Sequence, residues 1–454
     1  MKRIMKYLTG LVFLLTVSGC IPDQAVIWSP DGKQAIVLSD GNMYRCTPDG
    51  ALSEKLLGGV FRAAWLSDST HLVIARSVEF SQWEQAKDYL LPKDQERIAE
   101  LTQKINTAYE ALGDIEQAAE SLLEDIDLLG SEVGLIGLYA KAYYPEMVTA
   151  AELEEDVESA SVHLIELLEL RNGALGSKRT LGSALMLPVW SLRVSPDDTA
   201  AAFSSGEVIG DDADPASLYV VSLKDGAAVR KVADHVTLYP DWTRDSRSLV
   251  YAASDNAFCD DEPVSGRILS QCVCDEKGLL ETFEEPDLLV YAMVDSLSRV
   301  RCLPDESLVF SAFEVSFPAV PEDLPEQINL FRFDPQHPSS IGRVVPRDIQ
   351  ACLGDLTSLF EPSPDGRHIA FVGSDDRISV LDVSAGQLTQ LQKEVAESDS
   401  LPPGWRNNDE LTCVSKGTNG VSVLHYFLEL SPVTESSEFN TNWPEEVLDG
   451  FFDD

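Results

Sequence analysis

The stretch Trp28-Ser29-Pro30-Asp31-Gly32-Lys33 decides the fold of this chain. Proline fixes φ at the second position of a tight turn, aspartate suits the third position, and glycine tolerates the positive φ that often follows. A short apolar run ends in Trp28, and Ala35-Ile36-Val37-Leu38 follows the turn. The stretch therefore predicts a tight turn that joins two strands of one sheet.

Versions of this turn recur along the chain, and about seven copies are enough for an array that closes into a ring of blades. We interpret the repeated aspartates as structural turn residues and not as a functional ring, because the turn itself explains them. Tryptophan precedes several of the turns and is most simply explained by packing between blades. The turn aspartates are Asp31, Asp68, Asp197, Asp245, Asp305 and Asp365, and a degraded copy is Trp405-Arg406-Asn407-Asn408-Asp409.

The repeat resembles the TolB-like, WD40-like β-propeller repeat, whose signature is a Trp-Ser-Pro-Asp-Gly turn between the first two strands of each blade. The copies at Pro30 and Pro364 keep the full Ser-Pro-Asp-Gly sequence, and the resemblance covers most of the chain outside residues 79–186. It implies a mainly β fold, a β-propeller of about seven four-stranded blades. TolB carries an α/β domain before its propeller, whereas we expect only an export signal here, so the resemblance implies the fold and not the Tol role.

The β pattern is interrupted from Pro92 to Asn172, where apolar residues recur at spacings of three and four. The first run predicts a helix of about 35 residues that ends at Gly130. A second run ends at Pro145, and a third opens with a capping box at Thr149 and continues through Leu167. These runs predict an inserted α-helical hairpin, a coiled-coil-like arm, and its acidic surface favours a role in docking a partner.

We divide the chain into five parts on these patterns. The fourth strand of the last blade is hard to find, so ring closure is the weakest step, and we expect a loosely ordered C-terminal tail. A long insertion is expected in the fourth blade, between Tyr251 and Leu288. The parts are a lipoprotein signal peptide at 1–19, the first blade and the start of the second at 20–82, the helical hairpin at 83–177, the remaining propeller at 178–431, and the acidic tail at 432–454.

The first twenty residues have the form of a bacterial lipoprotein signal. Lys2, Arg3 and Lys6 precede an apolar core from Leu8 to Val17 that is too short to span a bilayer stably. Val17-Ser18-Gly19-Cys20 resembles a lipobox, in which Cys20 is acylated and becomes the new N-terminus. The alternative is an ordinary signal peptide. We expect a lipid-anchored envelope protein facing the periplasm, and Ile21 favours the outer membrane in a bacterium with two membranes.

Seven further cysteines lie in a compartment that permits disulfides. Cys259 paired with Cys272 or Cys274 would connect the two ends of the fourth-blade insertion. Free thiols are an alternative, and zinc binding is a weaker one because the spacing matches no standard zinc site. The sequence predicts no metal and no cofactor.

The composition and motifs exclude several classes of function. With 76 acidic against 34 basic residues, the formal charge of -42 disfavours nucleic acid and anionic membrane surfaces. No Gly-x-Ser-x-Gly elbow, phosphate-binding loop or metal-binding histidine pair is present, so no catalytic residue is predicted. We expect a protein-binding scaffold. The alternatives are a carbohydrate- or small-ligand-binding module or enzyme that uses the central channel, and a purely structural envelope lipoprotein.

Overall fold

The computed structural model describes part of the chain, and every structural statement below concerns that part. Cys20, Cys259 and the signal segment lie outside it. The described residues are 25–112, 130–150, 159–171, 173–185, 187–206, 208–209, 212–213, 216–224, 228–254, 264–315, 328–337, 339, 341–345, 356–373, 378–391, 399–400, 403–417, 420–428, 434–436, 439 and 443–451.

The chain forms antiparallel sheets in which most strands pair with strands close to them in sequence. The first sheet consists of β1 (Val26–Trp28), β2 (Ala35–Ser39), β3 (Asn42–Cys46) and β4 (Leu57–Gly58). The second consists of β5 (Val60–Trp65), β6 (His71–Phe80), β7 (Ala160–Arg171) and β8 (Ala174–Thr180).

The third and fourth sheets touch through one pair, Val236 opposite Ala253, and are otherwise built like the first two. The third is β9 (Val189–Val194), β10 (Ala200–Ser205), β13 (Ala216–Ser222) and β14 (Arg230–Val236). The fourth is β15 (Asp241–Trp242), β16 (Ser248–Ser254), β17 (Val264–Cys272) and β20 (Asp287–Val294), with β23 (Glu314–Val315) on its edge. Two small hairpins accompany them: β11 (Val208–Ile209) with β12 (Asp212–Ala213), and β18 (Cys274–Asp275) with β19 (Gly278–Leu279).

The last three sheets follow the same order. The fifth is β21 (Val300–Cys302), β22 (Leu308–Ala312), β24 (Asn329–Phe333) and β25 (Gly342–Arg343). The sixth is β26 (Leu356–Pro362), β27 (His368–Gly373), β28 (Ile378–Asp382) and β29 (Gln387–Gln390). The last is β31 (Gly404–Trp405), β32 (Glu410–Gly417), β33 (Gly420–Phe427) and β34 (Thr434–Ser436), with β30 (Asp399–Ser400) also on β32.

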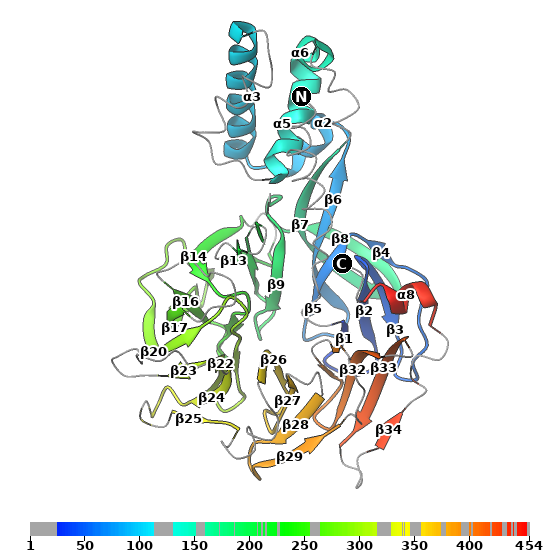
Figure 1. Ribbon diagram of the computed structural model, residues 1–454, viewed down its shortest axis with the longest axis vertical. Helices are drawn as coiled ribbons and strands as arrows, with labels where there is room; N and C mark the ends of the chain where they lie inside the picture. The colour runs from blue at the N-terminus through cyan, green and yellow to red at the C-terminus, as the bar shows by residue number, and fades with distance from the viewer. Residues whose placement is uncertain are drawn as a thin grey trace.

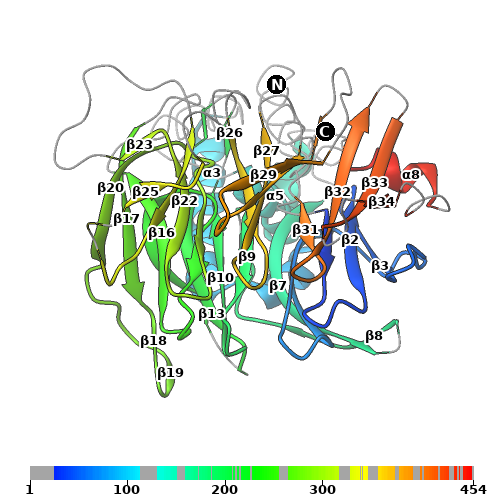
Figure 2. The ribbon, with the colours of Figure 1, turned by 90° about the horizontal axis from the view of Figure 1, so that it is seen from below.

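These sheets are arranged around an axis as a β-propeller (Figures 1 and 2). The first strands of successive sheets contact one another from β1 to β5, β9, β15 and β21, and β31 contacts β1 again. Hydrophobic clusters lie between neighbouring sheets, because both faces of the middle strands are buried: β2 and β10 are buried at every position. One cluster joins the first and last sheets, so the ring is closed.

The C-terminal segment closes the ring, and the expectation of a loosely ordered tail is wrong for its described residues. β34 supplies the fourth strand of the last sheet, and α8 (Glu445–Asp449) contacts β33 of the same sheet. Phe439 contacts Trp28 of β1, and Trp443 and Phe451 are buried in the same hydrophobic cluster. The Ser39 hydroxyl donates to the Val447 carbonyl at 2.6 Å, which holds the two ends of the chain together.

Helices are inserted between β6 and β7 and project away from the ring (Figure 1). They are α2 (Trp83–Ala86), the 3-10 turn η1 (Lys87–Tyr89), α3 (Pro92–Leu112), α5 (Gly130–Tyr143) and α6 (Pro145–Ala150). The helix predicted from Thr149 through Leu167 is wrong, because Ala160–Arg171 is strand β7. The boundary at residue 177 is therefore wrong as well, and the insertion covers residues 81–159.

The fourth-sheet insertion is smaller than predicted. β17 lies within it and pairs with β16 and β20 as an ordinary strand of that sheet. Among the described residues of this insertion, the β18–β19 hairpin lies beyond the sheet.

Candidate functional site

Each of the six turn aspartates is hydrogen-bonded within its own turn. Each carboxylate accepts a hydrogen bond from the backbone N–H two residues further on, at 2.8 to 3.2 Å. The residue after each aspartate has φ between 57° and 71°, including four that are not glycine. Burial acts to raise the pKa of Asp197, but hydrogen bonds from Ser195 and Thr199 outweigh it and lower this pKa. The carboxylates are thus used inside their own turns.

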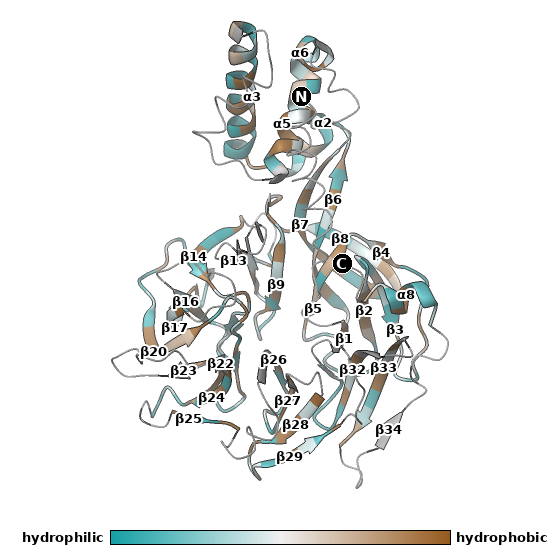
Figure 3. Cartoon of the chain, in the orientation of Figure 1, coloured by the Kyte–Doolittle hydropathy of each residue, from teal (hydrophilic) through white to brown (hydrophobic). Residues whose placement is uncertain are grey.

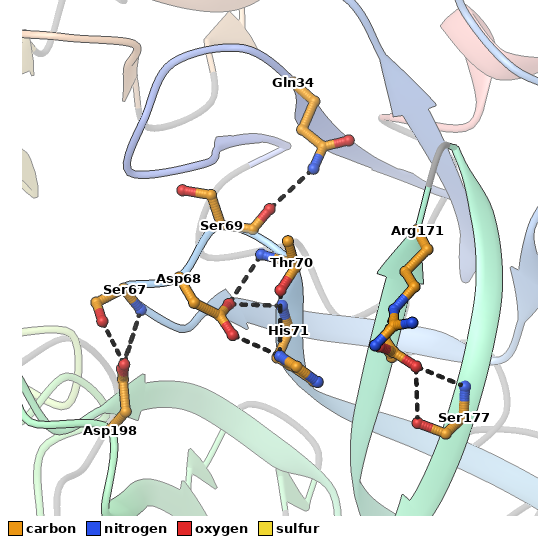
Figure 4. A network of polar contacts seen from close by, with 10 residues as sticks. Gln34, Ser67, Asp68, Ser69, Thr70, His71, Arg171, Ser177 and Asp198 are labelled. Atoms are coloured by element: carbon orange, nitrogen blue, oxygen red, sulfur yellow. Dashed lines mark hydrogen bonds and ion pairs between the residues drawn. The ribbon is translucent and has the colours of Figure 1, made fainter.

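Neighbouring turns are connected into a chain around one end of the ring. Figure 4 shows Asp198 accepting hydrogen bonds from the N–H and hydroxyl of Ser67, and Asp68 accepting from Thr70 and His71. The Ser69 hydroxyl accepts from the Asp31 N–H at 3.1 Å. The structure therefore places the repeated turns in contact with each other, where they stabilise the order of the sheets.

The tryptophans before the turns connect the sheets, as predicted. Each indole N–H donates to the innermost region of the preceding sheet: Trp65 to the Ile27 carbonyl at 2.9 Å, Trp242 to the Arg193 carbonyl at 3.2 Å, and Trp405 to the Glu361 carbonyl at 2.9 Å. Trp28 donates to the Thr412 hydroxyl at 2.9 Å, across the closure of the ring.

The structure describes two of the three cysteines of the predicted disulfide, Cys272 and Cys274. Cys272 and Cys274 form no disulfide with each other or with another cysteine in the described part of the chain. Burial raises the pKa of the Cys274 thiol to about 12, whereas the Cys272 side chain is exposed. Cys259 lies outside the described residues, so its pairing stays a prediction. Within the described part, no group of three or more His, Cys, Asp or Glu residues is placed to hold a metal ion.

A cluster of buried charged residues that the sequence did not indicate lies where the innermost strands meet. One oxygen of Glu361, Oε2, lies 3.2 Å from Arg193 Nη2, 3.3 Å from Arg299 Nη1 and 3.0 Å from Arg301 Nε. Arg299 is fully buried, and its guanidinium lies 4.2 Å from the centre of the Tyr239 ring. Because β9 and β26 belong to sheets that share no strand pairing, the contact of Arg193 with Glu361 joins separate sheets directly.

Asp241 of β15 extends this charged cluster. Its carboxylate accepts a hydrogen bond from the Cys302 N–H at 2.9 Å. Burial raises the pKa of Asp241, while Arg301 and Arg193 act in the opposite direction. Burial also raises the pKa of the Cys302 thiol well above its ordinary value. These groups connect the first strands of the third to sixth sheets, so the salt bridges have a structural role in this part of the ring.

The helical insertion has a hydrophobic core of its own. Strands β6 and β7 pair without interruption from His71 opposite Glu169 to Phe80 opposite Ala160, so the hairpin continues into the base of the insertion. Side chains from this hairpin and from α2, α3 and α5 form one cluster. Gly134 permits the close approach of α5 to β7, because a Cβ there would lie 3.1 Å from the Ala160 Cβ.

An ion pair fixes the two longest described helices of the insertion to each other. Glu132 of α5 is 1% exposed. Its carboxylate accepts two hydrogen bonds from Arg97 of α3, at 2.5 Å from Nε and 3.1 Å from Nη2. Breaking such a pair leaves a buried carboxylate without its partner, which is costly. The insertion is therefore held as a defined body at the end of a paired hairpin.

Aromatic side chains collect on the outer part of the insertion. Tyr139 contacts Trp83 edge to face, with ring centres 4.9 Å apart, and Tyr143 at 4.6 Å. Tyr143 is 51% exposed, the most exposed of the large hydrophobic side chains in the described structure. Its hydroxyl donates to Glu84 at 3.0 Å. Figure 3 shows α3 with hydrophilic and hydrophobic residues in alternating bands, as expected for a helix with one buried side.

No protein family model matches this chain, and no curated protein matches it. Many solved structures do resemble it. The β-propeller domain of Cps50 (Swd1) from Myceliophteria thermophila is 10% identical, with 87% of this chain and 93% of that chain covered and a TM-score of 0.45. Hydrazine synthase of Kuenenia stuttgartiensis is also 10% identical, with 89% and 95% covered and a TM-score of 0.46.

A puromycin hydrolase is 16% identical, with 61% of this chain and 43% of that chain covered and a TM-score of 0.42. This chain thus matches less than half the length of that enzyme. Resemblances of this strength carry no information about activity, and the propeller fold rests on the sheet order and ring contacts described above.

Proposed function

We propose that the protein is a lipid-anchored binding scaffold of the bacterial cell envelope, in which a ring of seven blades carries a helical hairpin that docks a partner protein. The blade number is supported by the seven stretches that each supply a first strand and its three followers. The observation that carries the proposal is the helical insertion: it has its own core, and the β6–β7 hairpin extends from the ring to support it.

The insertion is built for contact more than for the stability of the ring. The cores between neighbouring sheets are formed without it, and a separate cluster holds the insertion together. A chain that maintains a second core away from its main fold, with a tyrosine exposed on it, presents a surface that a partner can bury. Exposed aromatic residues are enriched among the residues that dominate protein interfaces.

The charge of the insertion indicates the chemistry of its partner. Residues 81–159 contain 19 acidic and five basic side chains. Complementary charge accelerates association and suppresses the wrong partners. We therefore expect a partner with a basic surface that includes an apolar pocket for Tyr143.

Site-specific photo-crosslinking in cells tests this proposal. A photo-reactive amino acid replaces Tyr143 on the insertion, and in a matched control it replaces Tyr291, which is 40% exposed on β20 of the ring. We expect a defined adduct with a basic protein from position 143 and none from 291. Changing Glu152, Glu154 and Glu155 to Gln should weaken this adduct. The same adducts from both positions, or none from 143, would contradict the docking role.

The membrane attachment rests on Cys20 and is tested separately. Within the described residues, no helix is both apolar and long enough to cross a bilayer. We expect the wild-type protein to incorporate labelled palmitate and to sediment with the outer membrane. The C20A variant should lose the label and appear in the soluble fraction. Unchanged sedimentation of C20A would contradict the lipid anchor.

A further inference from the structure

A cavity of about 540 Å³ lies between the third and fourth sheets, apart from the helical insertion. Its walls come from β14, β16, β17 and residues 283–286, which precede β20. Tyr251 and Gln271 line it although they are only 1% and 2% exposed, so the cavity reaches into the buried part of the sheet. A volume of this size is within the range of small-molecule sites.

Hydrogen bonds hold the rim of the cavity in place. The Gln271 amide donates to the Glu284 carbonyl at 2.6 Å, which connects the rim to β17. Near the cavity in sequence, Arg230 of β14 donates to the Leu280 carbonyl, which connects β14 to the segment before residues 283–286. The cavity is therefore formed before any ligand arrives, which avoids part of the ordering cost of binding.

The backbone of β14 is distorted where it lines the cavity. His235 has φ of 56°, in the left-handed region that side-chain-bearing residues rarely adopt. The register between β13 and β14 shifts twice nearby, between Ala216 and Leu218 and between Leu218 and Tyr219. Such strain is retained where the surrounding structure requires it, and it is frequent at ligand sites.

Tyr251 supplies the most specific indication of a ligand. Its side chain is 1% exposed and lines the cavity, which brings its hydroxyl within reach of a molecule bound there. Burial raises the pKa of Tyr251 to about 12, so the phenol is neutral and can both donate and accept. A hydroxyl at the wall of a cavity can therefore exchange a hydrogen bond with water for one with a ligand.

The charges around the cavity define the class of ligand. Asp234, Glu284 and Glu285 contribute carboxylates, which accept hydrogen bonds. Arg267 contributes a guanidinium and His235 an imidazole, both of which can donate them. This excess of carboxylates opposes an anionic ligand, and the carboxylates together with Arg267 offer the acceptors and donors that a ligand with several hydroxyl groups can use. Phe283 adds an aromatic surface, and the polar groups supply both donors and acceptors.

We propose that this cavity binds a neutral, polyhydroxylated small molecule of the size of a mono- or disaccharide, with the Tyr251 hydroxyl as a direct hydrogen-bonding group. This site is independent of the docking role proposed for the insertion, since no residue of 81–159 lines it.

Saturation-transfer NMR and calorimetry on the protein without its signal segment test the proposal. Glucose, N-acetylglucosamine and maltose serve as neutral probes, and spermidine and glycylglycine represent cationic and zwitterionic ligands. We expect at least one sugar to bind with a millimolar or lower Kd. The variant Y251F, which removes only the hydroxyl, should weaken that binding at least fivefold, whereas Y291F, on an exposed tyrosine outside the cavity, should leave it unchanged.

Several outcomes would overturn the proposal. They are the absence of binding by all three sugars, sugar binding that Y251F does not change, and binding of spermidine or glycylglycine alone with the same sensitivity to Y251F. The urea midpoint of Y251F is compared with that of Y291F, so that a folding defect is separated from a loss of the hydroxyl contact. If Y251F proves unstable, the variant E284Q takes its place in the test, and it too should weaken sugar binding.

Discussion

Each turn aspartate acts within its own repeat and contributes to the order of its neighbours. The Asp197 carboxylate accepts hydrogen bonds from the Ser195 hydroxyl at 2.7 Å and from the Thr199 N–H at 3.1 Å. Its own N–H donates to the Ser246 hydroxyl of the next turn at 3.0 Å. One residue thus fixes the local turn and lies in the connection between two sheets.

Removing the Asp197 carboxylate should destabilise the fold modestly. We expect D197A to lower the free energy of unfolding by about 1 kcal/mol, the usual contribution of such hydrogen bonds. D197N, which keeps an acceptor oxygen, should lose less than half as much. Urea unfolding followed by tryptophan fluorescence measures both values. Equal stability of wild type and D197A would show that the turn aspartates are dispensable.

His163 of β7 makes the stability of the protein depend on pH. Burial lowers the pKa of His163 to about 4, whereas an unfolded histidine titrates near 6.5. The unfolded state therefore binds more protons between these values. The contribution of buried, neutral His163 to the free energy of unfolding is complete above pH 6.5. It is lost as the pH falls towards 4, by up to about 3 kcal/mol.

The variant H163Q tests this dependence. Between pH 7.5 and pH 4.5, the free energy of unfolding should fall further for the wild type than for H163Q, measured by urea unfolding. The acidic residues and His425 are present in both proteins, so their titration cancels in the comparison. Parallel curves for the two proteins would show that His163 is not held neutral by burial.

At the scale of elements, the closure of the ring depends on the approach of two segments that are distant in sequence. Gly50 has φ of 82°, and a Cβ at this position would lie 1.9 Å from the Phe439 carbonyl oxygen. The Trp443 indole donates to the Gly50 carbonyl at 2.7 Å. The C-terminal segment can therefore cover the first blade only where no side chain intervenes.

Gly50→Ala should disrupt this contact. We expect a loss of about 2–3 kcal/mol, from backbone strain and from the displacement of the C-terminal segment. Gly386→Ala is the matched control: its φ is 62°, but no atom lies within 4 Å of the added Cβ, so about 1 kcal/mol of strain is expected alone. Urea unfolding and limited proteolysis near residue 440 measure the difference. Equal losses in the two variants would contradict the proposed closure.

The elements that the sequence predicted are those whose signal is local. The turn and the tryptophan before it lie within a few residues of each other, so the repeats and the propeller could be predicted from the sequence. β7 was mistaken for a helix because Ala160, Leu164 and Leu167 also fit helical spacing. Its ten paired positions with β6 decide the strand, and this pairing depends on residues about 90 positions earlier.

The candidate sites were less accessible for the same reason. Arg193, Arg301 and Glu361 form one cluster although they lie far apart in the chain, and none of them stands out in an acidic sequence. Trp443 and Phe451 show no periodicity, so only their burial in the cluster that joins the first and last sheets identifies them as core residues. The cavity beside Tyr251 is defined by two sheets and a loop, which no single stretch contains.

At the scale of the whole molecule, the ring and the insertion are separate bodies that share the β6–β7 hairpin. A ring-only variant follows from the register: Val78 lies opposite Val162, so an Asn-Gly turn can replace residues 79–161. Leu164 and Val162, which pack on the insertion core, become Thr in this variant to avoid an exposed apolar patch. We expect a folded monomer whose β content equals that of the ring.

The measurement that tests the central claim most directly is quantitative affinity capture from crosslinked cells, with the intact protein and the folded ring-only variant compared side by side. Both proteins keep Cys20, so they share the same membrane attachment. The account predicts a basic partner that the intact protein retains and the ring-only variant loses by at least tenfold. Equal recovery of the same partners by both proteins would place binding on the ring and contradict the docking role of the insertion.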